Sequence, residues 1–130
     1  MDHDEKKAQL AASARGQKLL ARFRELALEL PETAEVEAWG HPTFRVRNKI
    51  FASFGGRERA WSCGFKCSHE LQAALVESDE RFSVAAYVGK HGWVSMSLKG
   101  RPNWKEIGVL VRGSYRLVAP KTLARTVPED

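Results

Sequence analysis

The chain has 130 residues, 43% of them hydrophobic and 28% charged, and a formal net charge of +5 at pH 7. These values are typical of one globular domain with its own core, here expected to cover residues 1–130, and they exclude a disordered chain. No apolar run approaches the roughly 20 residues that span a bilayer, and the charged N-terminus is unlike a secretory signal. We therefore expect a cytoplasmic protein without membrane contact.

Positive charge is concentrated in the C-terminal two thirds of the chain. Residues 1–40 contain six Lys or Arg against eight Asp or Glu, whereas residues 41–130 contain fifteen against eight. A one-sided cationic surface attracts polyanions through electrostatic steering and counterion release. The alternative is that a mild basic excess only keeps the protein soluble.

Apolar residues of the first segment recur at three- and four-residue intervals, which predicts an amphipathic helix over about residues 5–30. The predicted apolar stripe consists of Ala8, Ala12, Leu19, Phe23, Leu26 and Leu30. Pro31 is expected to end the helix, since proline cannot continue the backbone hydrogen bonds. Residues 32–40 are interpreted as a connector.

A two-residue alternation follows, which predicts a strand meander over about residues 43–67. Phe44 and Val46 share one side of the first strand, and Arg45 and Arg47 share the other. The same division places Trp61, Cys63, Phe65 and Cys67 opposite Ser62, Gly64 and Lys66. One face of the sheet is thus apolar, and the other is small, polar and basic.

Two turns divide the predicted meander. Strands at 43–47 and 50–54 are expected to pair as a hairpin around Asn48, because asparagine tolerates the left-handed conformation of short hairpin turns. Gly55 and Gly56 are interpreted as the second turn, which leads to a strand over residues 60–67.

Cys63 and Cys67 are expected to be reduced core thiols. On one strand their Cα atoms lie about 13 Å apart, well beyond the roughly 4.4–6.8 Å of a disulfide. Joint zinc ligation fails for the same reason, and His69 does not supply a suitable partner.

The C-terminal half is predicted to continue with helices over about 69–78 and 104–118 and with strands within about 82–98. Ser68 is expected to cap the first helix, and Asn103 with Glu106 resembles a capping box for the second. Residues 82–88 read as extended. Residues 93–98 alternate cleanly, with Val94, Met96 and Leu98 on one side.

Several segments together resemble the MmcQ/YjbR-like family, formerly described as a domain of unknown function. They are the segments 48–52, Lys66, Ala86-Tyr87, Trp93-Val94 and 114–118. The resemblance covers nearly the whole chain from the first helix to Leu123. It implies an α+β fold similar to CyaY, with helices on one face of an antiparallel sheet of about five strands. It also implies a likeness to a double-wing DNA-binding arrangement, and it supplies no catalytic residues.

No motif for enzyme chemistry is present in the sequence. There is no nucleophile elbow, Walker loop, dinucleotide glycine pattern or zinc-binding spacing around His41, His69 or His91. We therefore predict neither an enzyme nor a cofactor, although catalytic groups can also converge from distant positions.

Two functions fit the basic face. The first is DNA binding through the hairpins and the open sheet face, with basic side chains contacting phosphates. The candidate residues are Arg45, Arg47, Lys49, Arg57, Arg59, Lys66, Lys90, His91, Trp93, Lys99 and Arg101. For Trp93, a core or edge position is the alternative to stacking on a ligand.

The second function is a protein-interaction or small-anion-binding module that uses the same face. Small residues such as Gly64 and Ser95 leave room above the sheet, where Arg45 and Lys66 can pair with the carboxylates of an acidic protein or with phosphates. A concave pocket would favour this second function, and flat projecting hairpins would favour DNA.

Overall fold

The computed structural model describes residues 3–57 and 60–129, and of these the side chains of residues 3–12 and 57 lie outside the description. The helices are α1 (His3–Leu28), α2 (His69–Ser78), the 3₁₀ turn η1 (Gly89–His91), α3 (Trp104–Val118) and α4 (Lys121–Ala124). The strands are β1 (Thr33–Ala38), β2 (His41–Val46), β3 (Lys49–Arg57), β4 (Ala60–Lys66), β5 (Phe82–Val84) and β6 (Trp93–Ser97).

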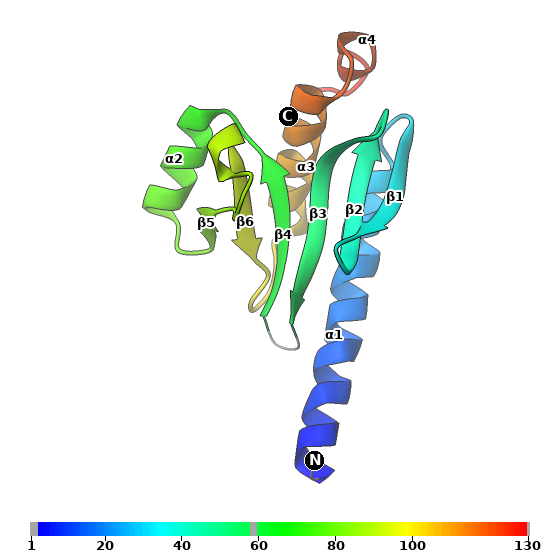
Figure 1. Ribbon diagram of the computed structural model, residues 1–130, viewed down its shortest axis with the longest axis vertical. Helices are drawn as coiled ribbons and strands as arrows, with labels where there is room; N and C mark the ends of the chain where they lie inside the picture. The colour runs from blue at the N-terminus through cyan, green and yellow to red at the C-terminus, as the bar shows by residue number, and fades with distance from the viewer. Residues whose placement is uncertain (1–2, 58–59, 130) are drawn as a thin grey trace.

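The six strands form one antiparallel sheet in the order β1-β2-β3-β4-β6-β5. Helices α1 and α3 lie behind this sheet in Figure 1, and α2 lies beside its β5 edge. The opposite face of the sheet has no helix over it in this view. The predicted fold class, an antiparallel sheet with helices packed on one face, is therefore confirmed, with one strand more than expected.

The extra strand is β1, in the segment interpreted from the sequence as a connector. Thr33 pairs with Val46 and Ala38 with His41, so this segment forms the outer edge of the sheet. Glu35 and Glu37 made this strand difficult to recognise in the sequence, because glutamate is depleted in strands. Charged side chains are nevertheless common on sheet edges.

Gly55 and Gly56 lie within β3 and do not form the second turn, so that prediction was wrong. They pair with Ser62 and Trp61 of β4, and the pairing continues to Arg57 and Ala60. Gly56 has φ +132°, and a Cβ there would lie 2.2 Å from the carbonyl oxygen of Ala60. Glycine is required here for backbone conformation and close strand approach inside a hairpin.

Residues 82–88 are only partly extended, contrary to the sequence interpretation. Strand β5 ends at Val84, and the backbone of Tyr87 then turns into the left-handed region with φ +64°. The amide of Val88 donates to the carbonyl of Ala86 (2.6 Å), which closes a tight turn around Tyr87.

The core lies between the sheet and helices α1 and α3. Phe23 of α1 contacts the rings of Phe44, Phe54 and Phe65, with centroid distances of 5.5, 5.9 and 6.0 Å. Leu19, Phe23 and Leu30 of the predicted stripe are buried, Leu26 is partly buried, and the side chains of Ala8 and Ala12 lie outside the described part. Burial of each large apolar side chain contributes about 1.5–3 kcal/mol.

Helix α3 is also joined to the sheet by a hydroxyl group. The last paired residues of β3 and β4 are Ala52 and Phe65, beyond which the two strands diverge in front of α3 (Figure 1). Ser114 Oγ donates to the carbonyl of Phe51 (2.6 Å) and accepts from the amide of Lys66 (2.9 Å). This buried side chain therefore satisfies both backbone groups at the point where direct strand pairing stops.

Replacing Ser114 by alanine is expected to lower the free energy of unfolding by about 2–3 kcal/mol, because it leaves a buried carbonyl and a partly buried amide without their partner. Urea unfolding monitored by circular dichroism measures this loss. Ser83→Ala, at an exposed position of β5, is the matched control and should change stability by less than about 0.5 kcal/mol. Equal stability of the two variants would contradict the role given to Ser114.

Both cysteines are free and buried on the core side of the sheet. Burial raises the pKa of the Cys63 thiol, and it raises the pKa of Cys67 in the same direction. The reactive thiolate is therefore suppressed at both positions near neutral pH.

We expect a disulfide reagent such as Ellman's reagent to leave both thiols of the native protein unmodified for minutes at pH 8. Both should react rapidly in guanidinium chloride, because unfolding exposes them and restores an ordinary pKa. Absorbance of the released thionitrobenzoate measures the number of reacted thiols. Fast release of one equivalent from the native protein would argue against the buried positions.

Candidate functional site

The open face of the sheet carries a groove of about 1100 Å³. Its floor is a row of small residues from four neighbouring strands, in which Thr43 pairs with Ser53, Ser53 with Gly64, and Gly64 with Ser95. A Cβ on Gly64 would lie 2.6 Å from Ser53 Oγ, so a larger residue there would displace its neighbour. The floor is low because these side chains are short.

Two aromatic side chains stand at the sides of the groove. Trp39 follows β1 and Tyr87 follows β5, the two edge strands of the sheet, and both residues line the groove. Trp39 is 82% exposed and Tyr87 is 98% exposed. Large rings are rarely left in water to this extent when packing alone determines their place.

Both aromatic residues also have an unfavourable backbone conformation. Trp39 has φ +53° and Tyr87 has φ +64°, in the left-handed region that bulky residues rarely adopt. Such residues cost roughly 1–2 kcal/mol each, and they cluster at functional sites because the surrounding structure holds them there. Strain and exposure therefore coincide at the same two positions.

The turn that carries Tyr87 is held by α2. Gln72 donates from Nε2 to the carbonyls of Gly89 (2.7 Å) and Trp93 (2.9 Å), and His69 donates to the carbonyl of Lys90 (2.8 Å). These bonds fix η1 and the start of β6, which follow Tyr87 directly. His69 therefore helps to hold η1 in place.

One end of the groove is cationic. Arg45 and Lys49 line it, and Arg45 is oriented by bonds from Nε to Thr43 Oγ1 and from Nη1 to Asn48 Oδ1, both 3.2 Å. Thr43 is held in turn by its own bond to the carbonyl of Val36. No carboxylate in the described part of the chain forms a salt bridge with Arg45, so its charge is available to a ligand.

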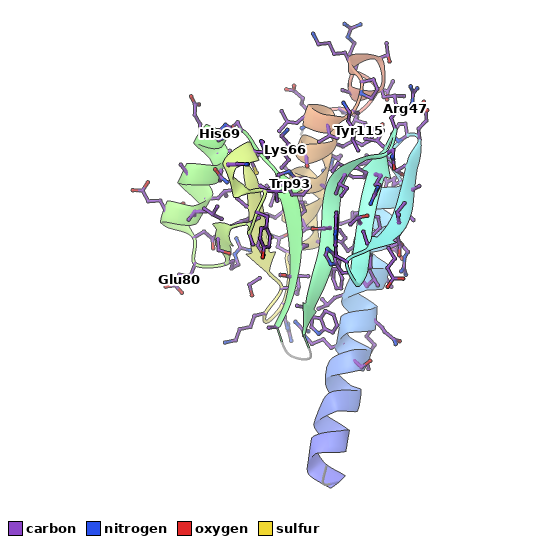
Figure 2. The ribbon with its side chains drawn as sticks, in the orientation of Figure 1. Arg47, Lys66, His69, Glu80, Trp93 and Tyr115 are labelled. Atoms are coloured by element: carbon purple, nitrogen blue, oxygen red, sulfur yellow. The ribbon has the colours of Figure 1, made fainter. Side chains whose placement is uncertain are left out.

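The structure brings only some of the predicted site residues to this groove. Arg45, Lys49 and Trp93 line it, while Lys66 is paired with Trp93 on the neighbouring strand but is not among the lining residues (Figure 2). Lys90 and His91 are exposed on η1, beyond the residues that line the groove.

Arg47 forms an exposed ion pair away from the groove lining. At the β2–β3 turn it donates to Glu32 at 2.9 and 3.3 Å, and this hydrogen-bonded pair lowers the pKa of the Glu32 carboxyl. Lys99 and Arg101 are exposed after β6, where Arg101 lines a different groove beside α1. Arg59 and the side chain of Arg57 lie outside the described residues.

Trp39 and Tyr87 were not among the residues predicted from the sequence. Trp39 lies near the end of the segment interpreted as a connector, which contains strand β1. Tyr87 was expected in an extended segment. The one available signal for Tyr87 was its place in the Ala86-Tyr87 segment of the family resemblance.

A metal site is not formed by the described side chains, among which no three His, Cys, Asp or Glu residues come together. Within the same part of the chain, none of the helices combines the length and apolar character needed to cross a membrane.

The profile of the YjbR family matches residues 28–117. The chain belongs to the YjbR family. This match includes the sheet, α2, most of α3 and every residue named above as lining the open-face groove. The resemblance inferred from the sequence segments is thus confirmed.

Two solved structures share the fold of this YjbR-family chain. The Deinococcus radiodurans protein DR2400, with a DUF419 domain, is 21% identical with a TM-score of 0.67, covering 82% of this chain and 86% of its own. A Pseudomonas syringae protein is 22% identical with a TM-score of 0.63, covering 75% and 97% respectively. A comparison with curated proteins finds no match.

The positive φ of Tyr87 predicts that a glycine variant at this position is more stable than an alanine variant, the reverse of the usual order. Tyr87→Gly should be more stable than Tyr87→Ala by about 1 kcal/mol, because glycine adopts a positive φ without a Cβ clash. Urea unfolding of the two variants measures the difference.

Leu117, an exposed residue of α3, supplies the control for this prediction. There alanine should be more stable than glycine by about 1 kcal/mol, as in ordinary helices. The same order at both positions would mean that the backbone of Tyr87 is not strained.

Proposed function

We propose that this protein is a binding module whose open-face groove takes a small organic anion with a planar ring. The observation that carries this proposal is the pair of exposed, strained aromatic residues, Trp39 and Tyr87, on the same groove as Arg45. Aromatic faces stack on planar rings, and a guanidinium binds carboxylate or phosphate oxygens. The groove thus offers complementary contacts to both parts of such a ligand.

The size of the groove, its low floor and the fixed orientation of Arg45 support the same ligand class. A volume of about 1100 Å³ accommodates a ligand of nucleotide size. The floor of Ser53, Gly64 and Ser95 lets the ligand approach the sheet, and it offers hydroxyl groups for hydrogen bonds. Because bonds to Thr43 and Asn48 orient Arg45 before binding, less side-chain entropy is lost on complex formation.

Duplex DNA is supported less well by this geometry. That prediction needs the cations of both hairpins on one surface, yet Arg47 is bound to Glu32 and Arg101 lines a groove beside α1. The open face is concave where Trp39 and Tyr87 border it, whereas DNA was expected to meet flat projecting hairpins. The geometry therefore favours the small-anion alternative.

Nuclear magnetic resonance of the four tryptophan indole N–H groups tests the proposal. We expect AMP, FMN or indole-3-acetate to shift the Trp39 and Trp93 resonances saturably, with a Kd of about 1 mM or better for at least one of them. Adenosine and inorganic phosphate, which carry only the ring or only the charge, should each bind at least about tenfold more weakly than AMP if AMP is the ligand that binds.

Matched variants locate the binding. Arg45→Gln and Tyr87→Ala should each weaken binding of the best probe about tenfold, because each removes a charge-assisted contact or a stacking ring. Lys121→Gln, on α4 just beyond the C-terminal end of α3 (Figure 1), should change the affinity for the same probe less than twofold. The proposal fails if none of the probes shifts Trp39 or Trp93, or if a DNA duplex shifts them more strongly than every small anion.

A further inference from the structure

A second groove of about 770 Å³ lies between α1 and the segment that joins β6 to α3. It is separate from the open-face groove, since the two have no lining residue in common. Four of its nine lining residues are cationic and none is acidic; the cationic ones are Arg15, Lys18, Arg22 and Arg101. Like charges at this density repel one another unless an anion lies between them.

Two of the four cations are held in place by the protein. Arg15 donates from Nη2 to the carbonyls of Leu98 (2.8 Å) and Gly100 (2.7 Å), which leaves its Nε and Nη1 donors without a hydrogen bond to the described residues. These carbonyls carry no net charge, so the positive charge of Arg15 is retained. A guanidinium has five N–H donors, so the remaining ones can bind a ligand.

Arg22, two turns further along α1, is also held in place at this groove. Its guanidinium carbon lies 6.0 Å from the ring centre of Trp104, a cation–π contact, and Nη1 donates to Glu25 at 2.9 Å. Arg22 is thus partly compensated, and the Trp104 ring becomes a wall of the groove.

All four cations are exposed, and Lys18 and Arg101 are the two that have no hydrogen bond to the described residues. In residues 3–57 and 60–129, neither has a salt bridge to a described carboxylate. Gly100, with φ +79°, makes the turn that brings Arg101 back toward α1. The groove therefore combines two cations that the protein holds in place with two that are free of such contacts.

We propose that this groove binds a phosphate-bearing anion, with Lys18 and Arg101 contacting phosphate oxygens and Arg15 donating from Nε and Nη1. Several cations around one hollow suit a ligand with more than one negative charge, and arginine matches phosphate oxygens with two parallel donors. A single carboxylate would leave most of this charge unbalanced. The phosphates belong either to a free oligophosphate or to a nucleic-acid backbone.

Tripolyphosphate is the probe for this site. Its titration into the full chain should shift the Trp104 indole N–H resonance saturably and leave those of Trp39 and Trp93 nearly unchanged. The double variant Lys18→Gln/Arg101→Gln should bind at least about tenfold more weakly, because two charge-assisted contacts are lost. Isothermal titration calorimetry measures the same affinities independently.

The control removes the same amount of charge elsewhere. Lys121→Gln/Arg125→Gln, at exposed positions of α4 and just after it, should change the affinity less than twofold. Circular dichroism checks that both double variants keep the native fold. Equal loss in the two double variants, or no saturable shift of Trp104, would overturn the proposal.

A short DNA duplex then distinguishes the two sources of phosphate. If the duplex displaces tripolyphosphate from the native protein, and the Lys18→Gln/Arg101→Gln variant loses duplex affinity in parallel, the ligand is a nucleic-acid backbone. If the duplex does not compete, the ligand is a free oligophosphate. Both outcomes support the groove as a phosphate site. Because Trp39 and Trp93 report on the open-face groove and Trp104 on this one, failure of either proposal can be distinguished from failure of the other.

Discussion

The contact of Phe23 with Phe44, Phe54 and Phe65 fixes the long helix on one face of the sheet. Helix α3 packs on β3 and β4 of that face and α2 on its β5 end, and the helices together bury its apolar residues. The other face must then remain compatible with water. Its central row of short, polar side chains meets this requirement, and their small size creates the hollow that borders Trp39 and Tyr87.

The sequence was sufficient for the parts of the fold that depend on periodicity. The alternation in β4 and β6, the cap residues Ser68 and Asn103, and the helical spacing in α3 are local signals, and the structure contains the corresponding elements. Edge strand β1 lacked such a signal because its glutamates resemble those of a solvated connector. The glycines of β3 were misread because a close approach of two strands and a turn both require glycine.

The candidate site was much harder to predict, because its residues come from separate parts of the chain. Trp39, Arg45 and Tyr87 meet only after β1 and β5 have taken the two edges of the sheet. The distribution of charge along the sequence did not indicate the second groove, because Arg101 is joined there by Arg15 and Lys18, which lie in residues 1–40, the segment with a net negative charge. Arg47 forms an ion pair with Glu32, a residue fifteen positions earlier in the sequence that the sequence analysis did not connect with it.

The position of Ser114 also bears on how the domain assembles. The halves β1–β3 and β4–β6 are paired directly over only part of the length of β3 and β4, and a side chain of α3 completes their connection. A sheet formed without α3 would leave an unsatisfied carbonyl and amide at its middle. We therefore expect docking of this helix and closure of the two half-sheets to belong to one cooperative folding unit, although the residues involved are separated by 48 and 63 positions in the chain.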